Sequence, residues 1–162
     1  MRKLALDRLG DLFAAIAARQ ALYLPVDTPA GAKYERWTEG SRLSESLNTV
    51  RSPKDFFFPQ MENLMDFKTE GKSIEIVDTR TESEPFVVFG VRACHVRSFD
   101  ILDRVFLSEP VDTFYKNRRE HGVIMSLACT RPQETCFCGT FGIDAADPAG
   151  DIACPKTADE LY

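Results

Sequence analysis

The first part of the chain combines one helical pattern with two short extended patterns. Apolar side chains recur at helical spacing among alanines, which predicts an amphipathic helix over residues 4–22. The apolar run at residues 23–26 predicts a short strand, and Pro25 places it at a sheet edge or at a strand end. After a turn with proline and glycine, residues 33–38 predict a second short strand.

The middle of the chain carries weaker signals. Ser52 is a favourable helix N-cap with Pro53 at the first helical position, but Pro59 interrupts a helix that begins there. Alternation of isoleucine with polar residues predicts a strand over residues 73–78. Before it, residues 60–67 predict a helix whose apolar side chains turn inward, namely Met61, Leu64, Met65 and Phe67.

The second half of the chain changes to a pattern of strand, helix and strand. The apolar runs at residues 86–89 and 123–128 are typical of buried strands, whereas residues 96–106 and 112–120 show helical spacing. A parallel pair of strands joined by a helical crossover is the economical interpretation. The sequence therefore predicts an α/β (or α+β) fold, with a small mixed sheet flanked by helices and a βαβ unit spanning about residues 86–128.

The length of 162 residues suits one domain with its own hydrophobic core. We expect residues 1–150 to form this single α/β domain. Residues 151–162 have the composition of a further element that is cut short. The chain is therefore expected to be the N-terminal part of a longer subunit.

Composition narrows the class of protein. A net charge of −5 argues against a nucleic-acid partner. No apolar run approaches the ~20 residues of a membrane span, and no secretory segment follows the basic start, so we expect a cytoplasmic protein. Five cysteines in such a chain indicate metal binding, redox chemistry or burial in the core rather than structural disulfides.

Four of these cysteines form the main candidate site, with the spacing C-x34-C-x6-C-x-C. Cys94 and Cys129 each follow one of the two predicted buried strands, and Cys136 and Cys138 come soon after. If the two strands end side by side, the thiols meet at one edge, where four thiolates can bind an iron–sulfur cluster or zinc. Gly139 would let main-chain amides approach cluster sulfides closely.

The spacing alone does not separate this interpretation from simpler ones. It matches neither the bacterial ferredoxin run nor the usual zinc spacing, and free cysteine is often buried as a small apolar residue. A redox disulfide between Cys136 and Cys138 would be strained. Cys94 beside His95 has no orienting acid for nucleophilic catalysis. Cys154 precedes a proline and is expected to be a bystander, or a ligand for whatever lies downstream.

Basic residues gather around the cysteine segments. Arg92 and Arg97 near a cluster would stabilise its negative charge and raise its reduction potential. The alternative is salt bridging with carboxylates such as Asp100 and Asp103, which is the commoner role of such residues. No glycine-rich nucleotide-binding motif is present in the sequence, so no nucleotide site is predicted within it.

Four segments together resemble the N-terminal domain of a family of electron-transfer proteins. They are residues 52–60 (SPKDFFFPQ), residues 89–94 (FGVRAC), residues 118–120 (RRE) and the run Cys129-x6-Cys136-Phe137-Cys138. The family comprises iron–sulfur subunits similar to those of anaerobic sulfite reductase and to the beta subunit of sulfhydrogenase, proteins that contain a 4Fe-4S dicluster domain. The likeness extends over residues 4–142.

The resemblance implies a role in electron transfer. In this family a ferredoxin-like module with two four-iron clusters follows the domain, and the subunit passes electrons between a flavin- and NAD(P)-binding partner and a catalytic subunit. It also implies that Cys94, Cys129, Cys136 and Cys138 bind an additional [4Fe-4S] cluster, and that the chain is not catalytic alone. Two alternatives stay open: a cluster-free domain that docks a ferredoxin module, and a structural zinc-binding domain.

Overall fold

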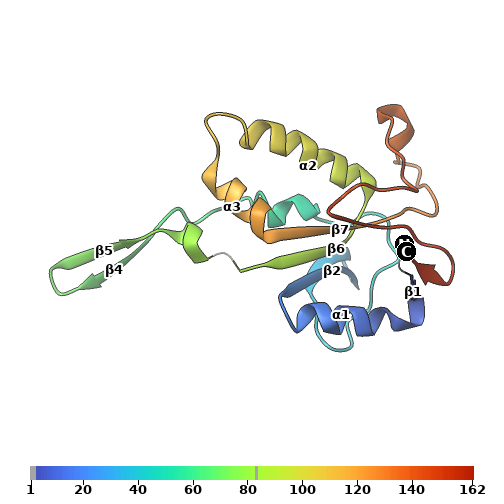
Figure 1. Cartoon of the computed structure of the whole chain (residues 1–162), viewed down its shortest axis with the longest axis horizontal. Coiled ribbons are helices and arrows are strands. Elements are labelled where there is room, and N and C mark those ends of the chain that lie inside the picture. The colour runs from blue at the N-terminus through green and yellow to red at the C-terminus, as the bar shows by residue number, and fades with distance from the viewer. Residues whose placement is uncertain (1–2, 83) are drawn as a thin grey trace.

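A five-stranded sheet forms the centre of the computed structural model, which describes residues 3–82 and 84–162 (Figure 1). Its strands are β2 (Ala21–Thr28), β3 (Gly31–Arg36), β6 (Phe86–Val91), β7 (Gly122–Leu127) and β8 (Ile152–Cys154). They lie in the order β3-β2-β6-β7-β8. β2 and β3 form an antiparallel hairpin, whereas β2, β6, β7 and β8 run parallel to one another.

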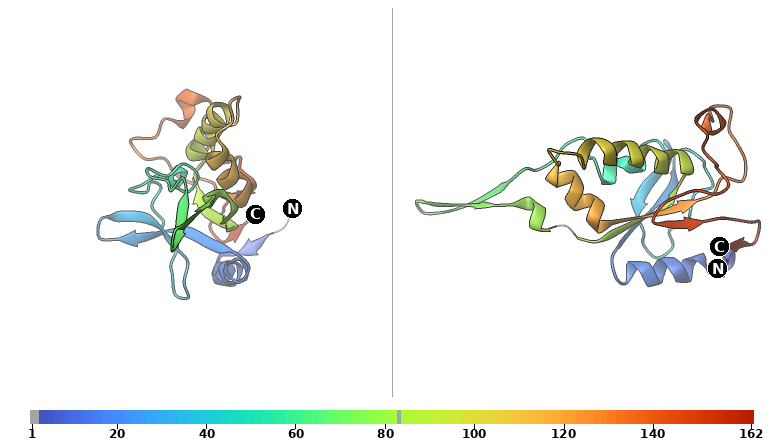
Figure 2. Two further views of the ribbon diagram at one scale, coloured as in Figure 1. Left: turned by 90° about the vertical axis from the view of Figure 1, so that its left-hand side faces the viewer. Right: turned by 45° about the horizontal axis from the view of Figure 1, so that its top comes forward.

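Helices cover both faces of this sheet (Figures 1 and 2). α1 (Leu9–Ala17) lies on one face, and α2 (Ala93–Phe106) and α3 (Thr113–His121) lie on the other. The unit β6–α2–α3–β7 confirms the predicted βαβ crossover, and the mixed sheet flanked by helices confirms the predicted fold class. The short 3₁₀ helices are η1 (Leu6–Arg8), η2 (Pro53–Phe56), η3 (Thr79–Glu82) and η4 (Cys138–Phe141).

Two small antiparallel sheets complete the described part of the chain. β1 (Leu4–Ala5) pairs with β9 (Glu160–Leu161), so the two ends of the chain lie side by side. β4 (Asp66–Glu70) and β5 (Ser73–Val77) form a hairpin arm that projects from the body of the domain (Figure 1).

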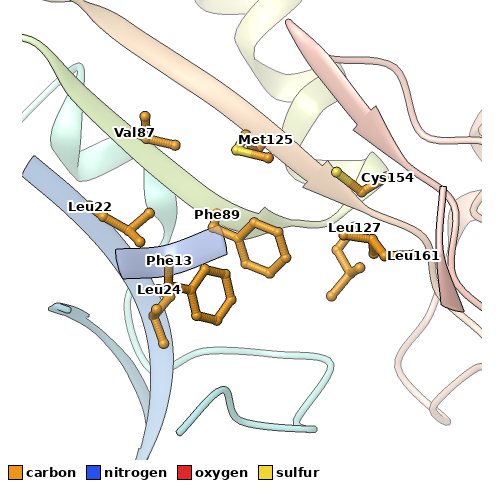
Figure 3. Close-up of a cluster of buried hydrophobic side chains, with 9 residues drawn as sticks. All are labelled: Phe13, Leu22, Leu24, Val87, Phe89, Met125, Leu127, Cys154 and Leu161. Carbon is orange, nitrogen blue, oxygen red and sulfur yellow. The ribbon is translucent and has the colours of Figure 1, made fainter. Parts of the chain in front are cut away.

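Alternate residues of the central strands supply two separate cores. On the α1 face, Phe89 and Met125 are buried beside Phe13, whose ring centroid lies 4.9 Å from that of Phe89 (Figure 3). On the other face, Val88 and Ile124 are buried against side chains of η2, α2 and α3. Because both faces of β6 and β7 are covered, these strands are largely apolar rather than alternating, with the buried Ser126 of β7 as a polar exception.

The predicted helix over residues 4–22 is too long at both ends. The α-helix covers only Leu9–Ala17, and Ala21 and Leu22 belong to β2, where they pair with Phe86 and Val87. Leu22 was expected to end the helix, but it is 1% exposed as a strand residue. Pairing with β6 therefore decided where the helix stops.

Pro25 lies inside β2 and not at the edge of the sheet, because β2 stands between β3 and β6. Its missing N–H is nevertheless not needed for pairing, since the β2–β6 ladder covers only Ala21 to Tyr23. Beyond that point the Pro25 ring packs against Gly90, where an added Cβ would lie 3.2 Å from the proline Cδ. The expectation that Pro25 lies at a sheet edge or at a strand end is therefore wrong, since β2 continues to Thr28.

The predicted helix over residues 60–67 is wrong. Residues 66–70 form β4 instead, and Phe67 pairs with Ile76 across the hairpin. Gly71 adopts a positive φ of 61° in the turn that makes this pairing possible. The apolar side chains that were expected inside are exposed, with exposed fractions of 88% for Met61 and 71% for Phe67. Without a buried face, helical spacing in so short a segment carries little information.

Residues beyond 150 pack with the rest of the chain. β8 extends the central sheet next to β7, and β9 pairs with β1. The expected division at residue 150 and the longer parent subunit stay predictions. Among the described residues, no helix is long and apolar enough to cross a membrane.

The start of α3 offers a direct test of local helix stabilisation. The Asp112 Oδ1 atom accepts hydrogen bonds from the main-chain N–H groups of Phe114 at 3.0 Å and Tyr115 at 2.9 Å. We expect Asp112→Ala to lower the free energy of unfolding by about 1 kcal/mol, because two N–H groups lose their acceptor. Urea unfolding measures this loss. Asp112→Asn, which keeps a capping oxygen, should retain most of the stability; an equal loss in both variants would contradict the capping role.

Candidate metal centre

The parallel sheet brings two distant cysteine segments to one edge. Cys94 is the second residue of α2, directly after β6, and Cys129 follows the end of β7 by two residues. Since β6 and β7 are adjacent and parallel, their carboxyl ends meet at the same edge. This placement agrees with the expectation from the two apolar runs.

The loop that carries Cys136 and Cys138 folds over the N-terminal end of α2 (Figure 1). Its base is closed by a hydrogen bond of 2.8 Å from the Cys129 N–H to the carbonyl oxygen of Ala145. Its outer part forms η4, after which Gly142 takes a left-handed conformation with a φ of 62°. The side chain of Asn48 donates a hydrogen bond of 2.6 Å to that of Gln133, which ties the loop to a third segment.

Three of the four predicted thiols border one cavity of about 450 Å³, namely those of Cys94, Cys136 and Cys138. Cys129 does not line this cavity, but its thiol is close enough to the others to affect ionisation. Burial raises the pKa of Cys94, and the neighbouring thiols of Cys138 and Cys129 raise it further. Four thiolates gathered at one centre would repel one another, so a bound cation would be needed to stabilise them together.

The pKa of Cys129 is subject to opposing effects. Burial raises its pKa, and Cys138 and Cys136 act in the same direction, whereas the charge of the Arg92 guanidinium and a hydrogen bond from it lower the pKa. Arg92 is only 8% exposed. Its Nη1 atom donates to the carbonyl oxygen of Ala128 at 3.0 Å, and its Nη2 atom donates to that of Ser46 at 3.4 Å. The arginine therefore fixes the segment that presents Cys129.

The other two predicted cofactor-binding residues have weaker support. Arg97 lines the cavity, but its Nη1 atom also forms a 2.9 Å ion pair with Asp100, as the alternative interpretation expected. Gly139 lies in the η4 turn, and an added Cβ there would meet no atom within 4 Å. No neighbouring protein atom therefore requires glycine at this position.

The thiols are near one another without forming a closed set of ligands. All five cysteines are free, and within residues 3–82 and 84–162 no three His, Cys, Asp or Glu side chains are grouped closely enough to hold a metal ion. The donor chemistry and the shared cavity suit an iron–sulfur cluster or zinc, because metal binding and the final ordering of thiolate ligands are coupled. Convergence on one centre stays a prediction.

Cys154 and His95 lie outside this cavity. Cys154 is buried in the core beside Met125 and Leu127 (Figure 3), as a small apolar residue would be. The His95 Nδ1 atom lies 3.1 Å from the Ser52 Oγ atom, and burial lowers the pKa of His95. The hydroxyl of a helix cap, and not an acid, therefore orients this histidine.

The sequence did not reveal an apolar rim around the cavity. Ile101, Phe137 and Phe141 line it and are 58%, 65% and 71% exposed. Phe137 and Phe141 stand within or beside the cysteine run, which is the signal that could have identified them. An apolar rim lowers the local dielectric around any group bound there and limits access of water.

The comparison with curated proteins finds one relevant likeness. The chain is 33% identical over 132 residues to a protein named sulfhydrogenase 2 subunit beta from Pyrococcus furiosus. The aligned part covers 81% of this chain but only 38% of that protein's length. No family model matches the chain, and no solved structure matches it. The likeness supports the sulfhydrogenase half of the expected resemblance; the sulfite reductase half stays a prediction.

Proposed function

We propose that this chain is an electron-transfer module of a multisubunit anaerobic oxidoreductase, in which Cys94, Cys129, Cys136 and Cys138 hold a [4Fe-4S] cluster. The observation that carries the proposal is the cavity bordered by thiols from two segments that are distant in sequence. The similarity to a sulfhydrogenase beta subunit supports the same role. The module would relay electrons between a partner that binds flavin and NAD(P) and a catalytic subunit.

The residues of this chain would have separate tasks. A bound four-iron cluster supplies one-electron transfer without bond-making at the protein. Arg92 holds the Cys129 segment and keeps a positive charge beside its sulfur. The apolar side chains of Ile101, Phe137 and Phe141 would lie beside a bound cluster and lower the local dielectric there, while Cys94 and Cys136 themselves are exposed.

Anaerobic reconstitution of the purified chain with iron and sulfide tests the proposal. We expect about four iron and four sulfide per chain, and a brown colour with an absorption shoulder near roughly 400 nm from thiolate-to-iron charge transfer. Elemental analysis of the protein as isolated separates iron from zinc. A chain that takes up neither iron nor sulfide would overturn the proposal, and one zinc per chain would favour a structural zinc site.

A second candidate, a cluster-free docking domain, is favoured by the β4–β5 arm. Phe67, Ile74 and Ile76 lie on one face of this hairpin and are 71%, 71% and 69% exposed. A two-stranded hairpin is marginally stable by itself, and such an apolar face suits contact with another protein. The triple phenylalanine is not that surface, since Phe57 is fully buried. Under the docking role, a chain with all four site cysteines replaced by alanine should still fold and bind its partner.

A further inference from the structure

A second cavity, of about 390 Å³, lies at the carboxyl ends of three parallel strands. Arg92 directly follows β6, Leu127 ends β7, and Lys156 stands two residues after β8. All three residues line the cavity. In open sheets of parallel strands, this edge is the usual position of a ligand site. No cysteine borders the cavity, but Arg92 links it to the thiol site, because the same side chain holds the segment that presents Cys129.

The cavity concentrates positive charge in a chain whose net charge is −5. Arg92, Arg131 and Lys156 line it together with a single carboxylate, that of Glu45. Three cations and one anion leave two net positive charges. Within residues 3–82 and 84–162, none of the three cations forms an ion pair with a carboxylate.

The positive charge of Arg92 is the most important of the three, because this side chain is only 8% exposed and is therefore largely removed from water. Its guanidinium donates to the main-chain oxygens of Leu127, Ala128 and Ser46. These groups satisfy its N–H donors without neutralising its charge. A buried cation without a carboxylate is costly, and an anion nearby compensates it.

The rest of the lining is largely leucine, from η1, α1, the loop after β3 and the end of β7: Leu6, Leu9, Leu43, Leu47 and Leu127. One part of the cavity is therefore cationic and another is aliphatic. A volume of this size and this division of polar and apolar lining are typical of sites for small organic ligands.

We infer that this cavity binds an organic phosphate monoester whose phosphate lies among Arg92, Arg131 and Lys156 and whose apolar group lies on the leucines. A phosphate monoester carries a charge of about −1.5 to −2 at neutral pH, which matches the two net positive charges of the lining. Guanidinium groups also suit the geometry of phosphate oxygens.

Calorimetric titration of the full 162-residue chain with phenyl phosphate at constant ionic strength tests this inference. We expect phenyl phosphate to bind at least about tenfold more tightly than inorganic phosphate, because burial of the ring adds to the affinity. Phenol should bind at least about tenfold more weakly than phenyl phosphate, since it lacks the charge. Equal binding of phenol, or no binding of phenyl phosphate at millimolar concentration, would overturn the inference.

Two substitutions locate the site. Arg131→Ala and Lys156→Ala should each weaken phenyl phosphate binding about three- to tenfold through loss of one charged donor. Lys72→Ala is the charge-matched control, because Lys72 lies in the turn between β4 and β5, away from this edge of the sheet. An equal loss in the control would show general charge attraction and count against the cavity.

Phosphate binding in this cavity and cluster binding by the thiols can be tested separately. A chain with serine at Cys94, Cys136 and Cys138 should bind phenyl phosphate as the unmodified chain does, because no thiol lines this cavity. Cys129 is kept in this variant because Arg92, which lines the cavity, interacts with it. Loss of binding in that variant, with the fold intact by circular dichroism, would contradict an independent site. Circular dichroism also verifies that Arg131→Ala and Lys156→Ala are folded before their affinities are compared.

Discussion

Replacing any one of Cys94, Cys129, Cys136 and Cys138 by serine is expected to lower the iron retained after anaerobic reconstitution to less than about half of the unmodified value. Each thiolate supplies one of four ligands, and a serine oxygen is a harder donor that iron–sulfur clusters do not favour. Iron and sulfide assays, together with absorption near roughly 400 nm, measure the loss.

The fifth cysteine provides a matched control. Cys154 is 3% exposed and packs among Leu127, Met125 and Leu161 on the α1 face of the sheet (Figure 3). Cys154→Ala should retain the iron and the colour, at a modest cost in stability because a small apolar group is removed from the core. Full iron retention in Cys94→Ser would remove Cys94 from the ligand set and contradict the assignment of four cysteine ligands.

Phe57→Ala should lower the free energy of unfolding by about 3–5 kcal/mol, a large part of the stability of an ordinary domain. Phe57 has no exposed surface, and its ring centroid lies 4.9 Å from that of Phe99 and 5.3 Å from that of Phe86. Removal of the Phe57 ring would leave a cavity that β7 cannot easily fill, because β7 already lies in close contact with this ring. A Cβ added at Gly122 would lie 2.4 Å from the Phe57 Cε1 atom. Urea unfolding followed by circular dichroism measures the loss.

The neighbouring phenylalanine serves as the control for this substitution. Phe58 is 46% exposed and contacts the Phe106 ring at a centroid distance of 4.6 Å. Phe58→Ala should therefore cost no more than about 1 kcal/mol, since it loses one aromatic pair at the surface. If both variants lose the same stability, the core role assigned to Phe57 is wrong.

Residue type could not predict which of the three consecutive phenylalanines, at positions 56–58, is buried and which is exposed. Ser52 caps the 3₁₀ helix η2 through a hydrogen bond of 3.3 Å from the Lys54 N–H, as its place before Pro53 indicated. Which of the three rings enters the core depends on how η2 packs against α2 and β7. That packing involves residues far away along the chain, such as Phe99 and Gly122.

The hairpin arm shows why the helix predicted over residues 60–67 is wrong, whereas the strand predicted over residues 73–78 is confirmed by β5. Short apolar runs do not distinguish strand from helix, and the choice is then made by hydrogen-bond partners. The hydrogen-bond partners of residues 66–70 are residues 73–77, across the turn at Gly71. No buried face was involved, so the hydrophobic pattern carried no information about which way the side chains point.

The hydrophobic pattern is sufficient to predict the β6–α2–α3–β7 crossover and the placement of Cys94 and Cys129 at one sheet edge. Apolar runs mark strands buried on both faces, and residues that follow two adjacent parallel strands must emerge on the same side. Three-dimensional packing is what places Cys94, Cys136 and Cys138 around one cavity, buries Arg92 without a carboxylate, and forms a second, cationic cavity that Arg92 lines. These features join segments such as residues 43–47, 127–131 and 156, and no local pattern records contacts between side chains so far apart in the chain.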